Sequence, residues 1–161
     1  MNGGSGKPGQ RFIVSKSDAR ERAFRSRPWL APAATELRLE MAANEYESTE
    51  LVIVPLPGSL KDVRVSCTDL TSSNGASIRD VHVRPVADVW LHGGGRPDEW
   101  HPDVLLTTGA FDVPAERVAR GVWITVHTVA DTPAGQYSGT VKVSAAGCES
   151  AELPITVKVW D

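Results

Sequence analysis

The chain has 161 residues, with 17 basic and 20 acidic side chains and a net charge of -3. This length suits one domain and is far short of the roughly 250 residues of a (β/α)₈ barrel. The totals lack the basic excess that nucleic-acid binding usually leaves. Apolar runs are only a few residues long, whereas a membrane-spanning helix needs about 20 residues. We therefore expect neither a nucleic-acid partner nor a membrane partner.

The first 34 residues predict little regular structure. Residues 1–10 are rich in glycine and lack the apolar core of a signal peptide, so they read as a flexible leader or a remnant of expression cloning. Residues 11–34 form a partly irregular N-terminal segment, in which the charged stretch 18–27 could form a helical turn or two before Pro28. The remaining residues, 35–161, are expected to form one domain.

From Thr35 onward, apolar and polar residues alternate with a period of two, which is typical of half-buried strands. Turn sequences rich in Gly, Pro, Asn and Ser recur about every ten residues. The expected strands cover residues 35–41, 50–54, 63–67, 78–84, 86–90, 121–129, 137–143 and 153–159, and the last two look like a hairpin. No alternation of strands with helices appears, which disfavours a parallel α/β sheet. The sequence predicts an all-β, immunoglobulin-like antiparallel β-sandwich of about seven to nine strands with one long irregular loop.

The long irregular loop is expected at residues 91–112. Loops of this length in compact domains are usually functional or ordered by their own packing. The run His92-Gly93-Gly94-Gly95 imitates the oxyanion-hole loop of lipases. That interpretation requires a Gly-x-Ser-x-Gly elbow between a strand and a helix, which the chain lacks, and no P-loop motif follows either. We therefore read the run as a tight loop.

Five potential metal ligands crowd into this loop: His92, Asp98, Glu99, His101 and Asp103. Their spacing matches no compact ligand motif, and loops collect such residues by default. The sequence therefore predicts no metal site and no cofactor. Calcium held by loop carbonyls and carboxylates stays an alternative that no motif supports.

The five tryptophans are numerous for this length. Trp123 and Trp160 fall out of phase with the Val/Ile face of their strands, which places them toward solvent or under another part of the protein. We assign these two to a domain interface. Exposed aromatic rings also suit the C–H faces of sugars, so Trp90 and Trp100, with His92 and Asp98, are the candidate carbohydrate contacts.

No catalytic residue is predicted. Glycoside hydrolysis by paired carboxylates needs two acids that converge across a cleft, whereas adjacent Asp98 and Glu99 would diverge in an extended loop. Glu45 and Glu47 share a strand face with no pocket implied. His82 and His127 are read as ordinary solvated residues. Cys67 is in phase with the inward face of its strand and Cys148 lies in a turn, so a disulfide between them stays open.

Four segments in fixed order resemble a known family. They are ANEYESTELVI at 43–53, PDVLL at 102–106, VWITV at 122–126 followed by DTPAGQYSGTV at 131–141, and VKVWD at 157–161. Together they are similar to the N-terminal β-sandwich domain of glycoside hydrolase family 123 (β-N-acetylgalactosaminidase-like) and of related barrel proteins of unassigned function. The resemblance spans residues 35–161. Glu50 stands where the family favours Gln, and residues 92–100 have no counterpart.

This resemblance implies a sandwich that precedes a barrel, in a carbohydrate-active context and an extracellular or periplasmic location. The family's catalytic Asp and Glu lie in the barrel, so no catalytic residue carries over and the chain alone is expected not to be an enzyme. The expected function is a non-catalytic accessory module that supports a C-terminal barrel of the same protein and contacts glycan. A free-standing carbohydrate-binding module and a protein-binding structural sandwich are the alternatives, and whether the chain is a fragment or complete stays open.

Overall fold

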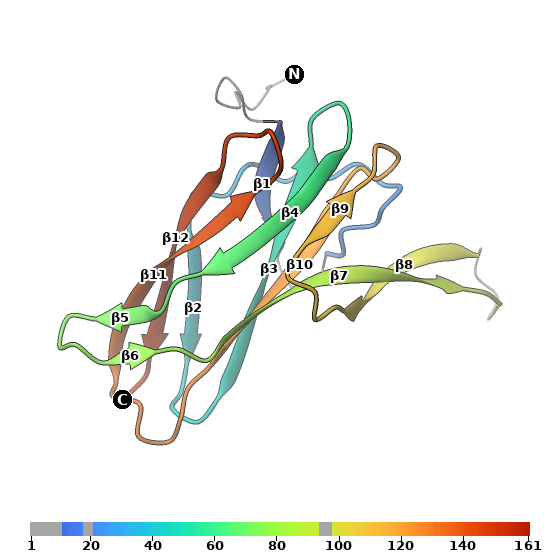
Figure 1. Ribbon diagram of the computed structural model, residues 1–161. Helices are drawn as coiled ribbons and strands as arrows, with labels where there is room; N and C mark the ends of the chain where they lie inside the picture. Colours follow the sequence, from blue (N-terminus) through green and yellow to red (C-terminus); the bar gives the residue numbers. More distant parts are fainter. Residues whose placement is uncertain (1–10, 18–20, 94–97) are drawn as a thin grey trace.

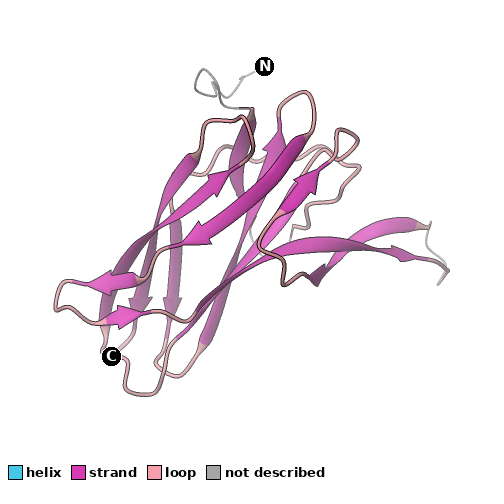
Figure 2. Ribbon diagram, viewed as in Figure 1, coloured by secondary structure: helices cyan, strands magenta, loops and turns pink. Residues whose placement is uncertain are grey.

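The computed structural model describes residues 11–17, 21–93 and 98–161. Across these ranges the regular structure consists of strands, and Figure 2 shows no helix. None of the described residues belongs to a helix long and apolar enough to cross a membrane. The strands form two sheets that pack as a sandwich, which confirms the all-β fold expected from the sequence.

The first sheet has five strands in the order β1-β3-β10-β7-β8, and each neighbouring pair is antiparallel. Its strands are β1 (Phe12–Ser17), β3 (Tyr46–Pro55), β7 (Val81–Leu91), β8 (Glu99–Leu105) and β10 (Arg120–His127). In Figure 1 the β7–β8 hairpin extends sideways beyond the other strands. This sheet carries the residues assigned from the sequence to carbohydrate contact, Trp90 on β7 and Trp100 on β8.

The second sheet has seven strands. Five follow the order β2-β12-β11-β4-β9, while β5 pairs with β11 and with β6. Its strands are β2 (Leu37–Met41), β4 (Leu60–Cys67), β5 (Leu70–Ser72), β6 (Ser77–Ile78), β9 (Phe111–Val113), β11 (Gly135–Ser144) and β12 (Ala151–Val159). The expected hairpin of the last two runs is confirmed as β11–β12. The β2–β12 pair is parallel, in contrast to the antiparallel remainder.

The core lies between the two sheets and follows from the period-two alternation of the strands. On β10, Val122, Ile124 and Val126 are fully buried, and Ile155 and Val157 of β12 are equally buried in the other sheet. All five belong to one continuous apolar cluster. Side chains between these positions therefore point to the outer face of their sheet, and this outer face is where polar groups gather.

The structure corrects the sequence expectations at three places. The described chain has twelve strands where about seven to nine were expected, because β1, β5, β8 and β9 lack a clear alternation. Residues 91–112 do not form one irregular loop, since they contain β8 and the first two residues of β9. No helical turn forms over residues 21–27, where only a turn near Arg25 occurs, and residues 18–20 lie outside the described chain.

Residues 21–34, called the strap below, cross the outer face of the five-stranded sheet. Ala33 forms an isolated bridge with Ser15, and the Ser15 hydroxyl donates to the Pro32 carbonyl over 2.7 Å. The Trp29 indole N–H donates to the same hydroxyl over 2.9 Å. Beneath the strap, Val52 packs in a second small apolar cluster. This cover explains why β3 is apolar on both faces from Leu51 to Val54, as buried strands are.

Candidate functional site

The β7–β8 hairpin brings together the two tryptophans assigned to carbohydrate contact. Trp90 and Trp100 are direct cross-strand partners. Their ring centroids lie 5.4 Å apart with an interplanar angle of 62°, an edge-to-face arrangement. Trp90 is 50% exposed and Trp100 is 42% exposed. Antiparallel pairing therefore creates one aromatic surface from residues ten positions apart in the sequence.

His92 and Asp98, the other two assigned residues, lie just beyond this pair. The His92 Nδ1 atom is 2.5 Å from Asp98 Oδ2, and the Gly93 N–H donates to Asp98 Oδ1 over 3.3 Å. Gly93 has a positive φ of 85°, which a glycine adopts without strain. The remaining glycines of the predicted tight loop, Gly94 and Gly95, lie outside the described residues. All four predicted contact residues are thus neighbours in space.

Three further apolar side chains on the hairpin are open to solvent: Leu91, Val104 and Leu105. Because successive residues of a strand point to opposite faces, Trp90, Trp100 and Leu105 lie on one face of the hairpin, and Leu91 and Val104 lie on the other. We call these five residues, which are exposed on the two faces of the hairpin, the hairpin patch. Nine large apolar side chains are exposed in the described chain, and five of them belong to this one hairpin. Scattered exposed apolar residues are ordinary on protein surfaces, whereas a concentrated group usually marks an interaction site.

The strap fixes the outer side of β8. The Arg27 Nη2 atom lies 2.5 Å from Glu99 Oε2, and the ring of Phe24 meets the His101 ring edge-on at 5.2 Å. The Arg25 guanidinium lies 5.3 Å from the centre of the Trp100 ring, within the range of a cation–π contact. Arg22 adds a bond from Nη1 to the Pro102 carbonyl over 3.4 Å. These contacts tie the hairpin to a segment more than 70 residues earlier in the chain.

A buried ion pair anchors the base of the hairpin. Arg117 binds both carboxylate oxygens of Asp88 on β7, and its Nε atom donates to the Ala119 carbonyl over 2.8 Å. Both side chains are nearly inaccessible, at 3% and 5% exposure. A break in register between Ala87 and Asp88 lies at the same point of β7. Such irregularities bend a strand, and here the bend is held by a bidentate charge pair.

Glu50 is a buried acidic side chain that the sequence pattern did not single out. Its side chain lies on the outer face of β3, only 7% exposed beneath the strap. Burial raises its pKa to about 7, against smaller opposing effects of the Ser17 hydrogen bond and the Arg22 charge. The carboxylate occupies space left by Gly121, where an added Cβ would lie 2.1 Å from Glu50 Oε1. The only sequence signal was an acid heading an apolar run, where the resembling family favours Gln.

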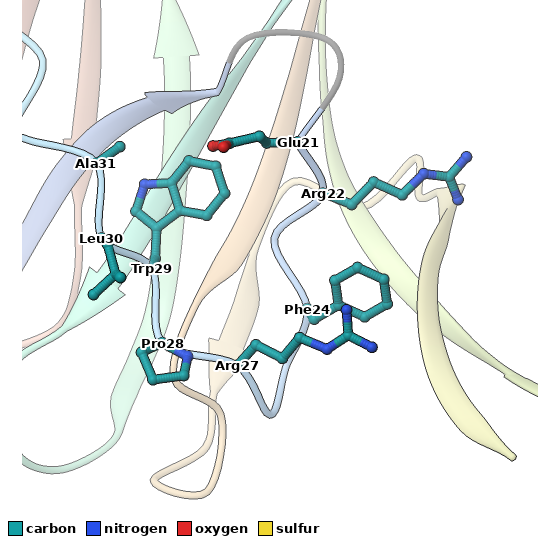
Figure 3. A pocket seen from close by; sticks show the side chains of 8 residues that line it. All are labelled: Glu21, Arg22, Phe24, Arg27, Pro28, Trp29, Leu30 and Ala31. Carbon is teal, nitrogen blue, oxygen red and sulfur yellow. The ribbon is translucent and has the colours of Figure 1, made fainter. Parts of the chain in front are cut away.

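A shallow pocket of about 540 Å³ opens on the strap. Its lining residues are Glu21, Arg22, Phe24, Arg27, Pro28, Trp29, Leu30 and Ala31, all from the strap itself. Figure 3 shows the Trp29 indole beside Glu21, while the Arg22 side chain extends away from Trp29. The pocket thus offers one carboxylate, and no second acid lines it. Two-carboxylate hydrolysis of a glycoside has no basis there.

The two tryptophans assigned to a domain interface lie on different sheets. Trp123 is a partly exposed residue on the outer face of β10, opposite Glu50 and Arg84 in the register. Trp160 follows β12 in the other sheet, is 48% exposed, and has the Lys158 ammonium 3.9 Å from its ring centre. The structure therefore does not bring them together as one surface. Their role at an interface stays a prediction.

The histidines of the outer face need one correction. His127 was expected to be solvated, but its side chain is only 18% exposed. It stacks on Tyr46 at 3.9 Å between ring centres, and its Nδ1 atom lies 2.8 Å from Asp80. His82 contacts the other oxygen of Asp80 at 2.9 Å. This arrangement is a local packing feature rather than a catalytic pair facing a cleft.

Metal and thiol chemistry find little support in the described part of the chain. No group of three or more His, Cys, Asp or Glu side chains there is arranged to hold a metal ion, and the expectation of no cofactor stays a prediction. Cys67 and Cys148 are both free thiols. Burial raises the pKa of the Cys67 thiol to about 11, so this group is neutral at physiological pH and a weak nucleophile.

Solved structures are similar to nearly the whole of this chain, whereas curated sequences are not. No curated protein gives a significant match to the sequence. A family 123 glycoside hydrolase from Clostridium perfringens, studied for glycolipid glycan hydrolysis, has a similar structure, with a TM-score of 0.84 and 14% identity over 93% of this chain. The ASH/PapD-like domain 7 of human CEP192 follows with a TM-score of 0.54 and 8% identity, covering 100% of this chain and 93% of that domain. At such identities the likeness shows the fold alone.

The chain spans 27% of the length of the clostridial enzyme, so most of that enzyme has no counterpart in this sequence. A family model, the glycoside hydrolase 123 N-terminal domain, matches residues 24–145. The match covers most of both sheets and the greater part of the strap. The chain therefore belongs to the glycoside hydrolase 123 N-terminal domain family.

Proposed function

We propose that this chain is a non-catalytic accessory sandwich that supports the catalytic barrel of a glycoside hydrolase 123-like protein. One observation carries the proposal: nearly the whole chain superposes on part of a family 123 enzyme, yet it spans only 27% of that enzyme's length. The reacting groups of such a protein then belong to the larger remainder. The proposed partner is a C-terminal barrel of the same protein, in an extracellular or periplasmic location.

The placement of the acidic residues supports this role. Glu50 is buried beneath the strap, Asp88 is neutralised by Arg117, and Asp98 is held by His92. A general acid and a carboxylate partner must both reach one substrate. In the described part of the chain, these three acids each contact a different partner and do not line a common cleft.

The test compares the 161-residue chain with the protein made from its full reading frame. We expect no turnover of an aryl β-N-acetylgalactosaminide by the 161-residue chain, and hydrolysis by the full-length protein. Measurable turnover by the chain alone would overturn the non-catalytic role. A reading frame that encodes no further domain would overturn the support of a barrel and favour a free-standing module.

Contact with glycan is a second candidate, favoured by one observation: Trp90, Trp100, His92 and Asp98 lie together on the hairpin. A sugar ring would lie on the exposed indole of Trp90, with polar groups of His92 and Asp98 near its hydroxyls. The measurement is tryptophan fluorescence of the isolated chain during titration with N-acetylgalactosamine and its oligosaccharides. Saturable binding that Trp90→Ala abolishes and Trp160→Ala preserves would support glycan contact, and an unresponsive signal would remove it.

A protein-binding structural sandwich is the other alternative. Trp123 of β10 and Trp160, which follows β12, come from different sheets and do not form one apolar patch. A protein-binding role has to use another surface, and the hairpin patch is the apolar surface concentrated enough for it.

A further inference from the structure

The hairpin patch is an apolar surface that this domain does not cover itself. Its five side chains lie on a hairpin that extends beyond the rest of the sheet (Figure 1). The core between the sheets is complete without them, since none belongs to its buried cluster. The patch therefore contributes nothing to the sandwich core that would explain its apolar character.

The patch is also held in place before any partner arrives. The Arg117–Asp88 pair fixes the base of the hairpin, and Arg27 and Arg22 bind β8 from the strap. A surface whose backbone is already fixed loses little conformational entropy when a partner binds. A projecting hairpin whose backbone is already fixed by these contacts is therefore suited to act as a docking surface.

The chemistry of the patch favours a protein over a glycan. The Arg25 guanidinium lies against the Trp100 ring, and the edge-to-face pairing prevents the two indoles from forming one flat platform. Val104 and Leu105 add aliphatic side chains, one on each face of the hairpin, that offer no hydrogen bonds to sugar hydroxyls. The nearby charges are already paired within the domain, as Arg27 with Glu99 shows. The surface offered is apolar and nearly neutral, like the centre of a domain interface.

A second copy of this chain is a poor occupant. β8 is the edge strand of its sheet, and edge pairing between two copies would need a regular row of free backbone groups. Pro102 in the middle of β8 has no N–H to donate, and the charged Asp103 lies beside it. Proline and charge on an edge strand are common protections against such pairing.

We propose that the hairpin patch is the docking surface for the catalytic domain of the same protein. This inference rests on the proposed function and adds the surface that the larger part of the protein covers. The clostridial relative supplies the argument for this occupant, since the chain spans only 27% of that enzyme's length. In the full-length protein the catalytic domain covers both faces of the hairpin, so that Trp90, Leu91, Trp100, Val104 and Leu105 become buried between the domains.

The test labels exposed tryptophans with hydroxyl radicals in the 161-residue chain and in the full-length protein. We expect Trp90 and Trp100 to be oxidised readily in the chain alone, as half-exposed indoles are, and several-fold less in the full-length protein. The double variant Trp90→Ser/Trp100→Ser then checks the consequence. It should split the thermal unfolding of the full-length protein into two separate transitions, whereas the 161-residue chain, which loses only the Trp90–Trp100 and Arg25–Trp100 contacts, should still unfold in one transition at a slightly lower melting temperature.

The matched control is Leu30→Ser, which removes an exposed leucine of the strap outside the patch. It should leave the full-length protein unfolding as before. If Trp90 and Trp100 are labelled as strongly in an active full-length hydrolase as in the 161-residue chain, the docking surface is overturned and the proposed function stays intact. Saturable sugar binding through Trp90 in that same protein would instead make the patch a glycan surface. A reading frame without a catalytic domain would overturn both proposals.

Discussion

Glu50 shows how one side chain is controlled by a fold that its sequence neighbours do not reveal. It lies on the outer face of β3, and Ser17 and Arg22 lie close to its carboxyl group. The space it occupies exists because residue 121 on β10 has no Cβ. A buried carboxyl group without a full charge partner resists ionisation, so the outer face of the sheet contains a group that titrates near neutrality.

The protonation of Glu50 predicts a pH-dependent stability. Its folded-state pKa of about 7 lies above the ordinary value of 4.5, so its contribution is fully present below pH 4.5 and is lost as the pH rises through 7. We expect Glu50→Gln to raise the free energy of unfolding at pH 8, by up to about 3 kcal/mol, since one pKa unit corresponds to about 1.4 kcal/mol. At pH 4 the two proteins should be nearly equal.

Urea denaturation of both proteins between pH 4 and pH 8 measures this difference. Glu47→Gln, on the same strand, is the control and should show the pH dependence of the original protein. A difference between Glu50→Gln and the original protein that stays constant across this range would contradict the assigned titration. The Gln that the resembling family favours at this position is neutral at every pH, in keeping with the same packing.

Gly121 makes a second prediction at the scale of one residue. Gly121→Ala places a methyl group 2.1 Å from Glu50 Oε1 and 3.1 Å from Val86 Cγ2. Overpacking of this kind typically costs about 1–3 kcal/mol. Gly109→Ala is the matched control, because nothing lies within 4 Å of its added Cβ. Chemical denaturation should show a loss for the first variant and little change for the second.

A double variant identifies the cause of this loss. Glu50→Ala/Gly121→Ala removes the carboxylate that the new methyl group meets, so the two changes should be less destabilising together than their sum. If the losses in the free energy of unfolding are strictly additive, the close approach of Glu50 to Gly121 does not explain why alanine at position 121 is destabilising.

At the scale of elements, the hairpin β7–β8 depends on a buried charge pair. Removing one partner of such a pair leaves the other charge uncompensated, at a cost of about 3–5 kcal/mol. Asp88→Ala should therefore destabilise the chain strongly, with Arg117 left without its carboxylate. Hydrogen exchange should also accelerate along β8, because the base of the hairpin loses its anchor.

Glu152→Ala provides the comparison for this prediction. Its partner Lys142 lies 3.4 Å away, and both side chains are more than half exposed, so its loss should cost less than about 1 kcal/mol. A similarly small cost for Asp88→Ala would show that the buried pair does not anchor the hairpin.

The same elements show what the sequence could predict. Strands such as β10 and β12 alternate strictly between apolar and polar residues, and their burial follows this alternation. β8 could not be predicted in this way, because Glu-Trp-His-Pro-Asp-Val-Leu has no alternation and contains a proline. Its position depends on bonds to Arg22 and Arg27, which lie 80 and 72 residues earlier. The residues of the candidate site could be named from the sequence, whereas their pairing across the hairpin required the fold.

At the scale of the whole molecule, the first strand and the strap join both parts of the fold. β1 pairs with β3 along six residues, and its Phe12 and Val14 enter the core. The strap then covers the outer face and binds β8. The domain division expected from the sequence separates residues 11–34 from the sandwich at 35–161, and this boundary stays a prediction that truncation can test.

We expect a chain of residues 35–161 to lose most of its stability. Removing β1 takes Phe12 and Val14 out of the core, and losing one large buried side chain typically costs about 2–5 kcal/mol. It also exposes Val52 and Glu50 and frees the edge of β3 for unwanted pairing. Since whole domains are stable by only about 5–15 kcal/mol, the truncated chain should unfold without a cooperative transition and aggregate. Removal of residues 1–10 is the control, expected to leave the melting temperature unchanged. A chain of residues 35–161 that melts cooperatively near the temperature of the complete chain would instead place the domain boundary at residue 35, making β1 and the strap an addition to a sandwich that is already complete.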